Sequence, residues 1–188
     1  MSHYTAYFAA TCLSLLIATT PSLAKDAPKK ELTVYTYDSF VSDWGMGPLI
    51  KPTFEEQCGC TLNLVGMEDA VAMLQRLKLE GASTKADIVL GLDLNLVDDA
   101  KKSGLFTTHT VDTSALEMPI DWQDDTFVPF DYGYFAFVYN TELMPNPPKS
   151  LDELVNAGPE LKIIIQDPRS STPGLGLLLW MKSVYGDN

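Results

Sequence analysis

Strand-like and helix-like segments alternate along residues 32–104, and this alternation constrains the fold more than any other feature of the chain. Three segments are rich in β-branched, aromatic or other apolar side chains and read as strands: residues 32–37, 61–65 and 87–91. Helices are predicted between and after them, over residues 49–57, 70–80 and 94–103. The pattern therefore predicts an α/β sheet of parallel strands joined by right-handed crossovers.

The predicted strands end on polar and aromatic residues. Tyr37-Asp38-Ser39, Met67-Glu68-Asp69 and Leu92-Asp93 stand at these three points. Ligands of open α/β sheets bind beyond the carboxyl ends of the strands. We therefore expect these tips to meet at one edge and to form a pocket of negative potential.

A second α/β unit is predicted after residue 130, and the stretch over residues 126–139 reads as the crossover between the two lobes. Residues 126–129, 134–139 and 163–166 read as strands, and Ser150 to Glu153 form a capping box for a helix that runs to Asn156. A longer helix is expected to begin with Thr172 as N-cap and Pro173 in first position, and to stop at Gly186. A unit with about two strands is small for a sheet, so the chain is expected to be the N-terminal part of a longer two-lobed protein.

The N-terminus has the layout of a secretory signal peptide. Residues 7–17 are apolar but too few to span a bilayer, and Ser22-Leu23-Ala24 precede Lys25 with small residues at the cleavage positions. A buried N-terminal helix is the alternative. The predicted organisation is thus a signal peptide over residues 1–24, a first α/β lobe over 25–130 and a partial second lobe over 131–188.

The charge balance excludes some classes of partner. Thirteen Lys and Arg stand against 25 Asp and Glu, a formal net charge of −12, whereas nucleic-acid binding needs a basic surface. After the N-terminal segment no apolar run reaches the 18 residues of a membrane span. The negative potential of such a chain favours a small molecule with a positive charge as its ligand.

The residues with reactive side chains form no evident catalytic set. Neither His3 nor His109 has the partners of a proton relay, and the nucleophile-elbow and phosphate-loop motifs are missing from the sequence. Cys58 and Cys60 flank Gly59 and could form a tight disulfide in an exported protein, or contribute two ligands to an incomplete zinc site. Aromatic residues such as Phe130, Tyr132 and Tyr134 are expected to serve structure. We therefore predict a protein that is not an enzyme.

Two positions allow a ligand role beside a structural one. The loop from Ser170 to Gly174 precedes a helix, whose free N–H groups and dipole favour an anion, although a plain N-cap explains Thr172 equally well. Asp69 is either an N-cap or a carboxylate that accepts hydrogen bonds from an amine. Tyr37 and Trp44 could offer π faces to a cation, or could simply pack.

Several longer stretches together resemble the thiamine-binding periplasmic proteins. The resemblance covers nearly all of residues 32–186, and its most distinctive parts are the stretches that start at Phe127 and Gln166. The segments that carry the resemblance are Leu32 to Phe40, Ala86 to Asp93, Phe127 to Tyr139, Gln166 to Arg169 and Ser171 to Trp180. The pair Cys58 and Cys60 also looks like the C-x-C of that family.

The resemblance implies the type II periplasmic-binding-protein fold, with two lobes of which the second is incomplete in this chain. It implies a receptor of an ATP-binding-cassette importer that takes up thiamine, thiamine monophosphate and thiamine diphosphate in the periplasm and delivers them to an inner-membrane permease, without cofactor or metal. Position by position, it implies ligand contacts at Tyr37, Trp44, Asp69, Ala70, Ser171 and Thr172. Ala70 stands where the family has Gly, which puts any backbone contact there in question.

Two other functions are compatible with a fold of this kind. A ferric-ion receptor would need Tyr, His or carboxylate ligands that meet at one metal. A thiamine-degrading transferase of similar fold would need a Cys nucleophile, and the resemblance implies that Cys58 and Cys60 are paired with each other. Paired ligand tyrosines are expected late in the chain of a ferric-ion receptor, and the pairing of the two cysteines disfavours the transferase.

Overall fold

The computed structural model of the protein describes residues 30–186. Its sheet has three parallel strands in the order β2-β1-β3, with β1 at Lys30–Tyr37, β2 at Cys60–Met67 and β3 at Ile88–Val89. The predicted signal peptide and its cleavage point lie outside the described residues.

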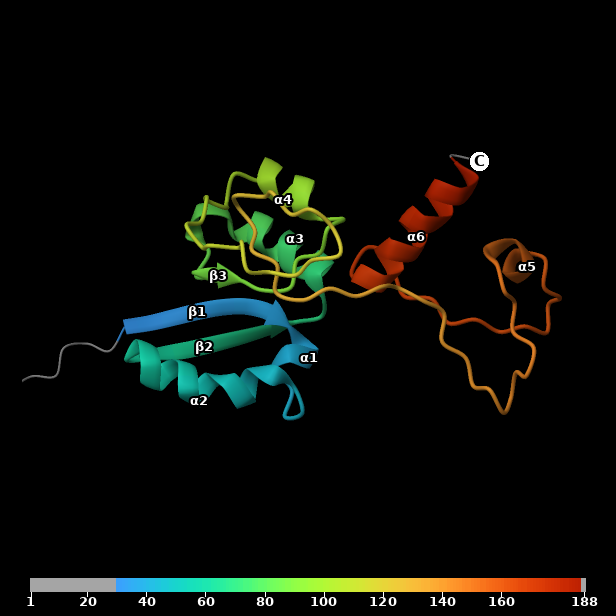
Figure 1. Ribbon diagram of the computed structural model, residues 1–188, viewed down its shortest axis with the longest axis horizontal. Coiled ribbons are helices and arrows are strands. Elements are labelled where there is room, and N and C mark those ends of the chain that lie inside the picture. The colour runs from blue at the N-terminus through green and yellow to red at the C-terminus, as the bar shows by residue number, and fades with distance from the viewer. Residues whose placement is uncertain (1–29, 187–188) are drawn as a thin grey trace, which may run out of the picture.

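Helices cover both faces of this sheet. The short α1 (Asp38–Val41) and the longer α2 (Met46–Cys58) connect β1 to β2, and α3 (Ala70–Glu80) with the 3₁₀ turn η1 (Gly81–Ser83) connects β2 to β3. Figure 1 shows α1 and α2 on one side of β1 and β2, and α3 with α4 (Val97–Lys102) on the other. Right-handed crossovers in opposite directions place helices on opposite faces, so the predicted α/β unit is confirmed, and residues 30–104 are called the first unit below.

The core of the first unit lies between the sheet and α3. Side chains at i, i+3, i+4 and i+7 of α3 (Ala70, Met73, Leu74 and Leu77) are buried, as the sequence pattern predicts. They form one cluster with Tyr35 from β1, Met67 from β2 and two residues of the α4 region, Leu96 and Ala100. This packing fixes the carboxyl ends of β1 and β2 relative to the start of α3.

The third strand is shorter than predicted. Residues 87–91 read as a strand, but only Ile88 and Val89 pair with β1. Gly91 has a φ of +105°, which takes the chain out of the extended conformation directly after the strand. Leu92 and Asp93 follow this residue, and the next turn spans residues 94–96.

The cysteine pair is a disulfide. Cys58, the last residue of α2, is bonded to Cys60, the first residue of β2, across a Cα–Cα distance of 5.2 Å. Gly59 between them adopts a φ of +60°, a left-handed conformation that glycine takes without a Cβ penalty. Of the two alternatives left open by the sequence, the structure contains the disulfide and not a pair of metal-binding thiolates.

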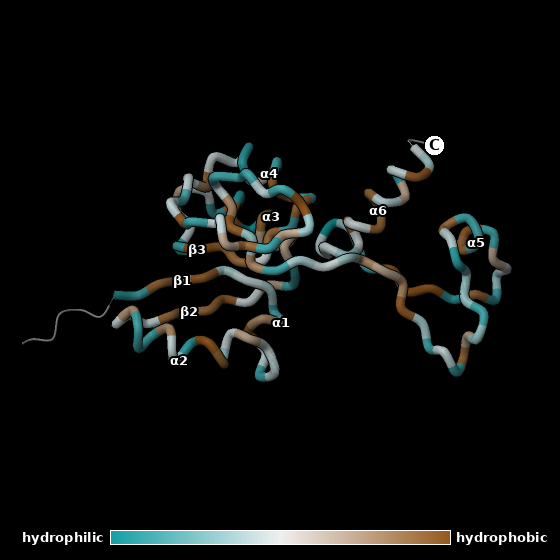
Figure 2. Tube along the Cα trace, in the orientation of Figure 1, coloured by the Kyte–Doolittle hydropathy of each residue, from teal (hydrophilic) through white to brown (hydrophobic). Residues whose placement is uncertain are grey.

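The second half of the described chain contains helices but no strand. It comprises α5 (Leu151–Val155) and α6 (Thr172–Tyr185), and the strands predicted over residues 126–129, 134–139 and 163–166 are wrong for this structure. A strand needs a neighbour for its backbone hydrogen bonds, and within residues 30–186 the sheet consists of β1, β2 and β3 alone. In Figure 1 these segments are extended chain that runs out to α5 and returns to α6. Figure 2 shows hydrophobic residues along this extended chain. Val138 is 95% exposed and Ile164 is 96% exposed.

The two predicted helix starts in this half differ in outcome. The N-cap of the capping box before α5 is confirmed, since Ser150 Oγ accepts from Glu153 N at 3.0 Å, whereas the Glu153 carboxylate accepts from Lys149 N at 2.8 Å, one residue before the N–H that a capping box uses. The prediction for α6 is wrong by one residue. Ser171, not Thr172, is the N-cap, because its hydroxyl is the one that accepts from Gly174 N. Helix α6 ends at Gly186, as predicted.

No helix in the described part of the chain is long and apolar enough to cross a membrane.

Candidate ligand-binding crevice

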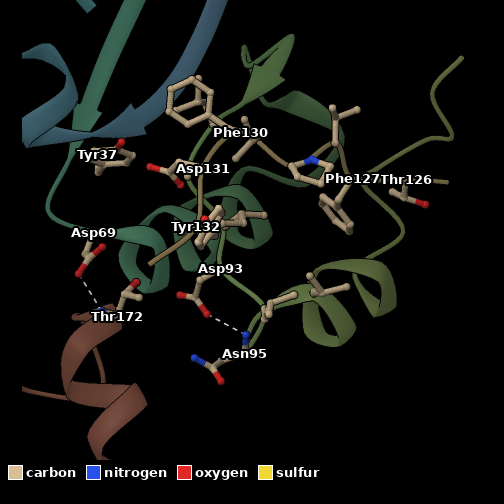
Figure 3. Close-up of a pocket in the computed structure, with 18 of the residues that line it drawn as sticks. Tyr37, Asp69, Asp93, Asn95, Thr126, Phe127, Phe130, Asp131, Tyr132 and Thr172 are labelled. Atoms are coloured by element: carbon tan, nitrogen blue, oxygen red, sulfur yellow. Dashed lines mark hydrogen bonds between the residues drawn. The ribbon is translucent and has the colours of Figure 1, made fainter. Parts of the chain in front are cut away.

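A cavity of about 1380 Å³ opens at the carboxyl edge of the sheet (Figure 3). The strand order β2-β1-β3 places β1 between the two strands that follow it in sequence, so the crossover from β1 to β2 and the crossover from β2 to β3 run in opposite directions across the sheet. Such a reversal leaves a crevice in which ligands of α/β proteins bind. The lining includes Tyr37 after β1, Glu68 and Asp69 after β2, and Leu92 and Asp93 after β3, so the expected convergence of the strand ends is confirmed. This cavity is called the crevice below.

The opposite wall of the crevice comes from the second half of the chain. Residues 126–135 line it together with the start of α6, at Thr172, Pro173 and Gly176. Phe130, Tyr132 and Tyr134 belong to this wall, although sequence reasoning assigned them to structure. Tyr134 lies in a predicted strand and the other two lie directly before it, and aromatic residues in or beside a strand usually mean packing. The crevice thus combines acidic groups from the sheet edge with aromatic surfaces from the connecting segment.

The Tyr37 side chain is fixed by close neighbours. Its ring meets Phe40 edge-on with centroids 5.7 Å apart, and Phe40 meets Phe130 in the same way at 6.0 Å. Burial raises the pKa of the Tyr37 hydroxyl above its usual value, and the negative charge of Asp131 raises that pKa further. The phenol therefore remains protonated at neutral pH and presents both a donor and a π face.

Asp69 connects the two sides of the crevice. Its Oδ1 accepts from Ala70 N at 2.8 Å and so caps α3, while its Oδ2 accepts from Thr172 N at 2.7 Å, at the start of α6 (Figure 3). A second polar contact joins the same elements, between Ser170 Oγ and Glu68 Oε1 at 3.4 Å. The N-terminus of α6 thus holds an anionic group of its own chain, which satisfies the preference of a helix start for negative charge.

Of the six residues predicted to contact a ligand, three line the crevice and three do not. Tyr37, Asp69 and Thr172 line the crevice. Ala70 is 1% exposed and belongs to the core, and Ser171 is buried behind the lining, where its hydroxyl hydrogen-bonds the Gln166 side chain. Trp44 is 78% exposed and does not belong to the lining.

Unpaired polar atoms concentrate in the crevice. Four buried side-chain polar atoms of the described residues have no hydrogen-bond partner, and three of them belong to lining residues: Asp93 Oδ2, His109 Nε2 and Thr172 Oγ1. Asp93 was recognisable from sequence as a strand tip, whereas His109 carried no such signal. Among residues 30–186 no group of three His, Cys, Asp or Glu side chains is placed to hold a metal ion.

Comparison with known proteins identifies the family. Residues 83–188, more than half of the chain, match the family described as bacterial extracellular solute-binding protein. A protein of Escherichia coli (strain K12) is 57% identical over 94% of this chain and 53% of its own length, and one of Brucella abortus is 60% identical over 85% and 48%. A relative from Haemophilus influenzae is 46% identical over 93% and 52%. All three bear the name thiamine-binding periplasmic protein.

A solved structure shares the fold. The chain superposes on a periplasmic thiamin binding protein with a TM-score of 0.80 and 59% identity, over 85% of this chain and 50% of the other. The chain spans about half the length of the curated relatives that it matches. On sequence and on structure, the chain belongs to the bacterial extracellular solute-binding proteins.

Proposed function

We propose that the protein is a periplasmic receptor that binds thiamine and its mono- and diphosphate and delivers them to an inner-membrane ATP-binding-cassette permease. The observation that carries this proposal is the crevice of acidic and aromatic side chains at the sheet edge. It occurs in a chain that is 46–60% identical to proteins named for thiamine binding.

The chemistry of the crevice suits the ligand. Thiamine carries a thiazolium cation and an aminopyrimidine, and both groups are flat. The rings of Tyr37, Phe130 and Tyr132 offer π faces to the cation. Asp69 has acceptor capacity beyond its two backbone contacts, since a carboxylate accepts about four hydrogen bonds, and it is proposed to bind the amino group of the pyrimidine.

The start of α6 is proposed to hold the phosphate end of an esterified ligand. The Thr172 hydroxyl lines the crevice without a hydrogen-bond partner within residues 30–186 and can donate to a phosphate. The phosphate would share the Thr172 N–H with Asp69 Oδ2, which already accepts from it. Ser171 would orient this loop from behind, and Ala70 and Trp44 are proposed as contacts on the resemblance alone.

The remaining parts of the proposal concern the whole protein. Residues 1–24 are proposed to direct export and to be removed, residues 25–130 to form the first lobe and residues 131–188 part of the second. The relatives are named as binding proteins, and we propose that this protein, likewise, releases its ligand unaltered and is not an enzyme.

The test is calorimetry on the full-length protein with the Asp69→Ala variant. The wild type is expected to bind thiamine, and the variant to bind it about tenfold more weakly or worse, because a hydrogen bond to a charged group is lost. Glu142→Ala is the matched control, since it removes the same charge from an exposed position outside the crevice. A wild type that ignores thiamine at millimolar concentration overturns the proposal, and unchanged affinity in Asp69→Ala rejects the role of Asp69.

A further inference from the structure

Asp93 lines the crevice, and only one of its two carboxylate oxygens accepts a hydrogen bond within the described residues. It follows β3, and its Oδ1 accepts from Asn95 N at 2.8 Å, which shapes the turn before α4 (Figure 3). Its Oδ2 is buried and has no hydrogen-bond partner within residues 30–186. A buried carboxylate oxygen without a donor is unfavourable, so we expect the missing partner to come from what occupies the crevice.

The other central carboxylate of the crevice is already engaged. Both oxygens of Asp69 accept backbone hydrogen bonds, one within α3 and one from α6. Asp124, two residues before the lining segment 126–135, is paired with Lys101; burial raises the pKa of its carboxyl, but the hydrogen bonds from Lys101 and from two backbone N–H groups outweigh burial and lower that pKa. Asp93 therefore has more unused capacity for a ligand than either of these groups.

The lining residues supply no cation to balance this charge. Among the described residues that line the crevice, five are acidic and none is Lys or Arg; the acidic ones are Glu68, Asp69, Asp87, Asp93 and Asp131. A partly buried site with this composition favours a positively charged occupant, because attraction between opposite charges strengthens as water is excluded.

We propose that Asp93 contacts the bound ligand and balances its positive charge, a role that rests on the proposed function and extends it. Thiamine offers two groups to a carboxylate: the amino group of its pyrimidine and its permanently charged thiazolium. Asp69 takes the amino group, and Asp93 faces the cation. Asp93 is thus a determinant of the preference for a cationic ligand.

A structural role for Asp93 predicts a different result from a ligand role. The Asp93→Asn substitution keeps an Oδ1 that can accept from Asn95 N, so the turn before α4 is preserved. It removes the negative charge and replaces the free oxygen by an NH₂ donor. Loss of binding in this variant, with an unchanged unfolding midpoint of the ligand-free protein, separates the two roles.

The experiment is calorimetry on the full-length protein with thiamine and with oxythiamine. Oxythiamine keeps the thiazolium but lacks the amino group, so it reports contacts with the cation alone. Asp93→Asn is expected to weaken the binding of both compounds by about tenfold or more. Asp98→Asn is the matched control, because it makes the same change five residues away at an exposed position outside the lining, and it is expected to bind both compounds like the wild type.

The outcomes separate this inference from the proposed function. A wild type that does not bind thiamine overturns both. If the wild type binds thiamine and Asp93→Asn binds both compounds as tightly as the wild type does, the role of Asp93 alone is overturned. The same follows if Asp93→Asn weakens the binding of thiamine but not that of oxythiamine. If Asp93→Asn does not fold, Asp93→Ser keeps an acceptor for Asn95 N and is judged by the same result.

Discussion

At the scale of single residues, Gly91 and Tyr37 show how a backbone position shapes the crevice. Gly91 has a φ of +105°, which L side chains rarely adopt. A Cβ built there would lie 2.4 Å from Cδ1 and 2.6 Å from Cε1 of Tyr37. The ring of Tyr37 therefore occupies the space that any larger residue at position 91 would need.

Gly91→Ala is expected to destabilise the protein and to displace Tyr37. Backbone strain and the steric clash together should lower the free energy of unfolding by about 2–4 kcal/mol, and binding of thiamine should weaken because the ring moves. Urea unfolding and calorimetry measure the two effects. Gly104→Ala is the control, since Gly104 has a φ of +69° with no heavy atom within 4 Å of the added Cβ, and it should lose only about 1 kcal/mol. An equal loss of unfolding free energy in the two variants would contradict this, because it would show that the Tyr37 ring moves away from the added Cβ without cost.

Sequence reasoning reached part of this residue-level picture. It placed Tyr37, Asp69 and Asp93 at the sheet edge, because the ends of parallel strands meet there whatever their other contacts. It chose Thr172 instead of Ser171 as the N-cap of α6, since both are good capping residues and the outcome depends on which hydroxyl reaches Gly174 N. Nor could it reveal that Oδ2 of Asp93 lacks a partner, which depends on the whole surrounding fold.

At the scale of elements, the packing of α3 on the sheet fixes the strand ends that line the crevice. Its first residue, Ala70, follows the Asp69 cap, and its apolar face packs on β1 and β2. Leu74 lies in the middle of this face and is fully buried. Loss of this packing would release the strand ends that carry the acidic groups.

Leu74→Ala is expected to lower the free energy of unfolding by about 2–5 kcal/mol, because it removes buried surface and leaves a cavity. Leu79→Ala, on the same helix, is the matched control: Leu79 is 88% exposed, and a change at such a site shifts stability by about 0.5 kcal/mol or less. Urea unfolding of the full-length variants checks both values. A similar small effect at both positions would contradict the assignment of the core.

The elements differ in how far the sequence predicts them. Helices α2, α3 and α6 depend on local periodicity and end signals, and their predicted positions are nearly those observed. Residues 134–139 and 163–166 have the composition of strands but none is formed, because pairing requires a neighbouring strand and the described residues place none beside them. Strand composition therefore shows what a segment can form, not what it forms without a partner.

At the scale of the whole molecule, the crevice lies between two parts of the chain that meet through polar contacts and through apolar ones, such as Phe40 with Phe130 and Leu175 with the core. The hydrogen bond from Thr172 N to Asp69 Oδ2 and the contact between Ser170 and Glu68 join residues more than 100 positions apart. The formal net charge of −12 and the acidic lining give the whole molecule the same electrostatic preference as its crevice. A small organic cation satisfies that preference at both scales.

We propose above that the protein binds thiamine in this crevice and releases it unaltered. Equilibrium dialysis of the full-length protein against thiamine, followed by mass spectrometry of the recovered ligand, tests it most directly. We expect saturable binding of one thiamine per protein and recovery of the vitamin with its mass unchanged. No retention above the buffer concentration, or release of a free pyrimidine fragment, would contradict the claim.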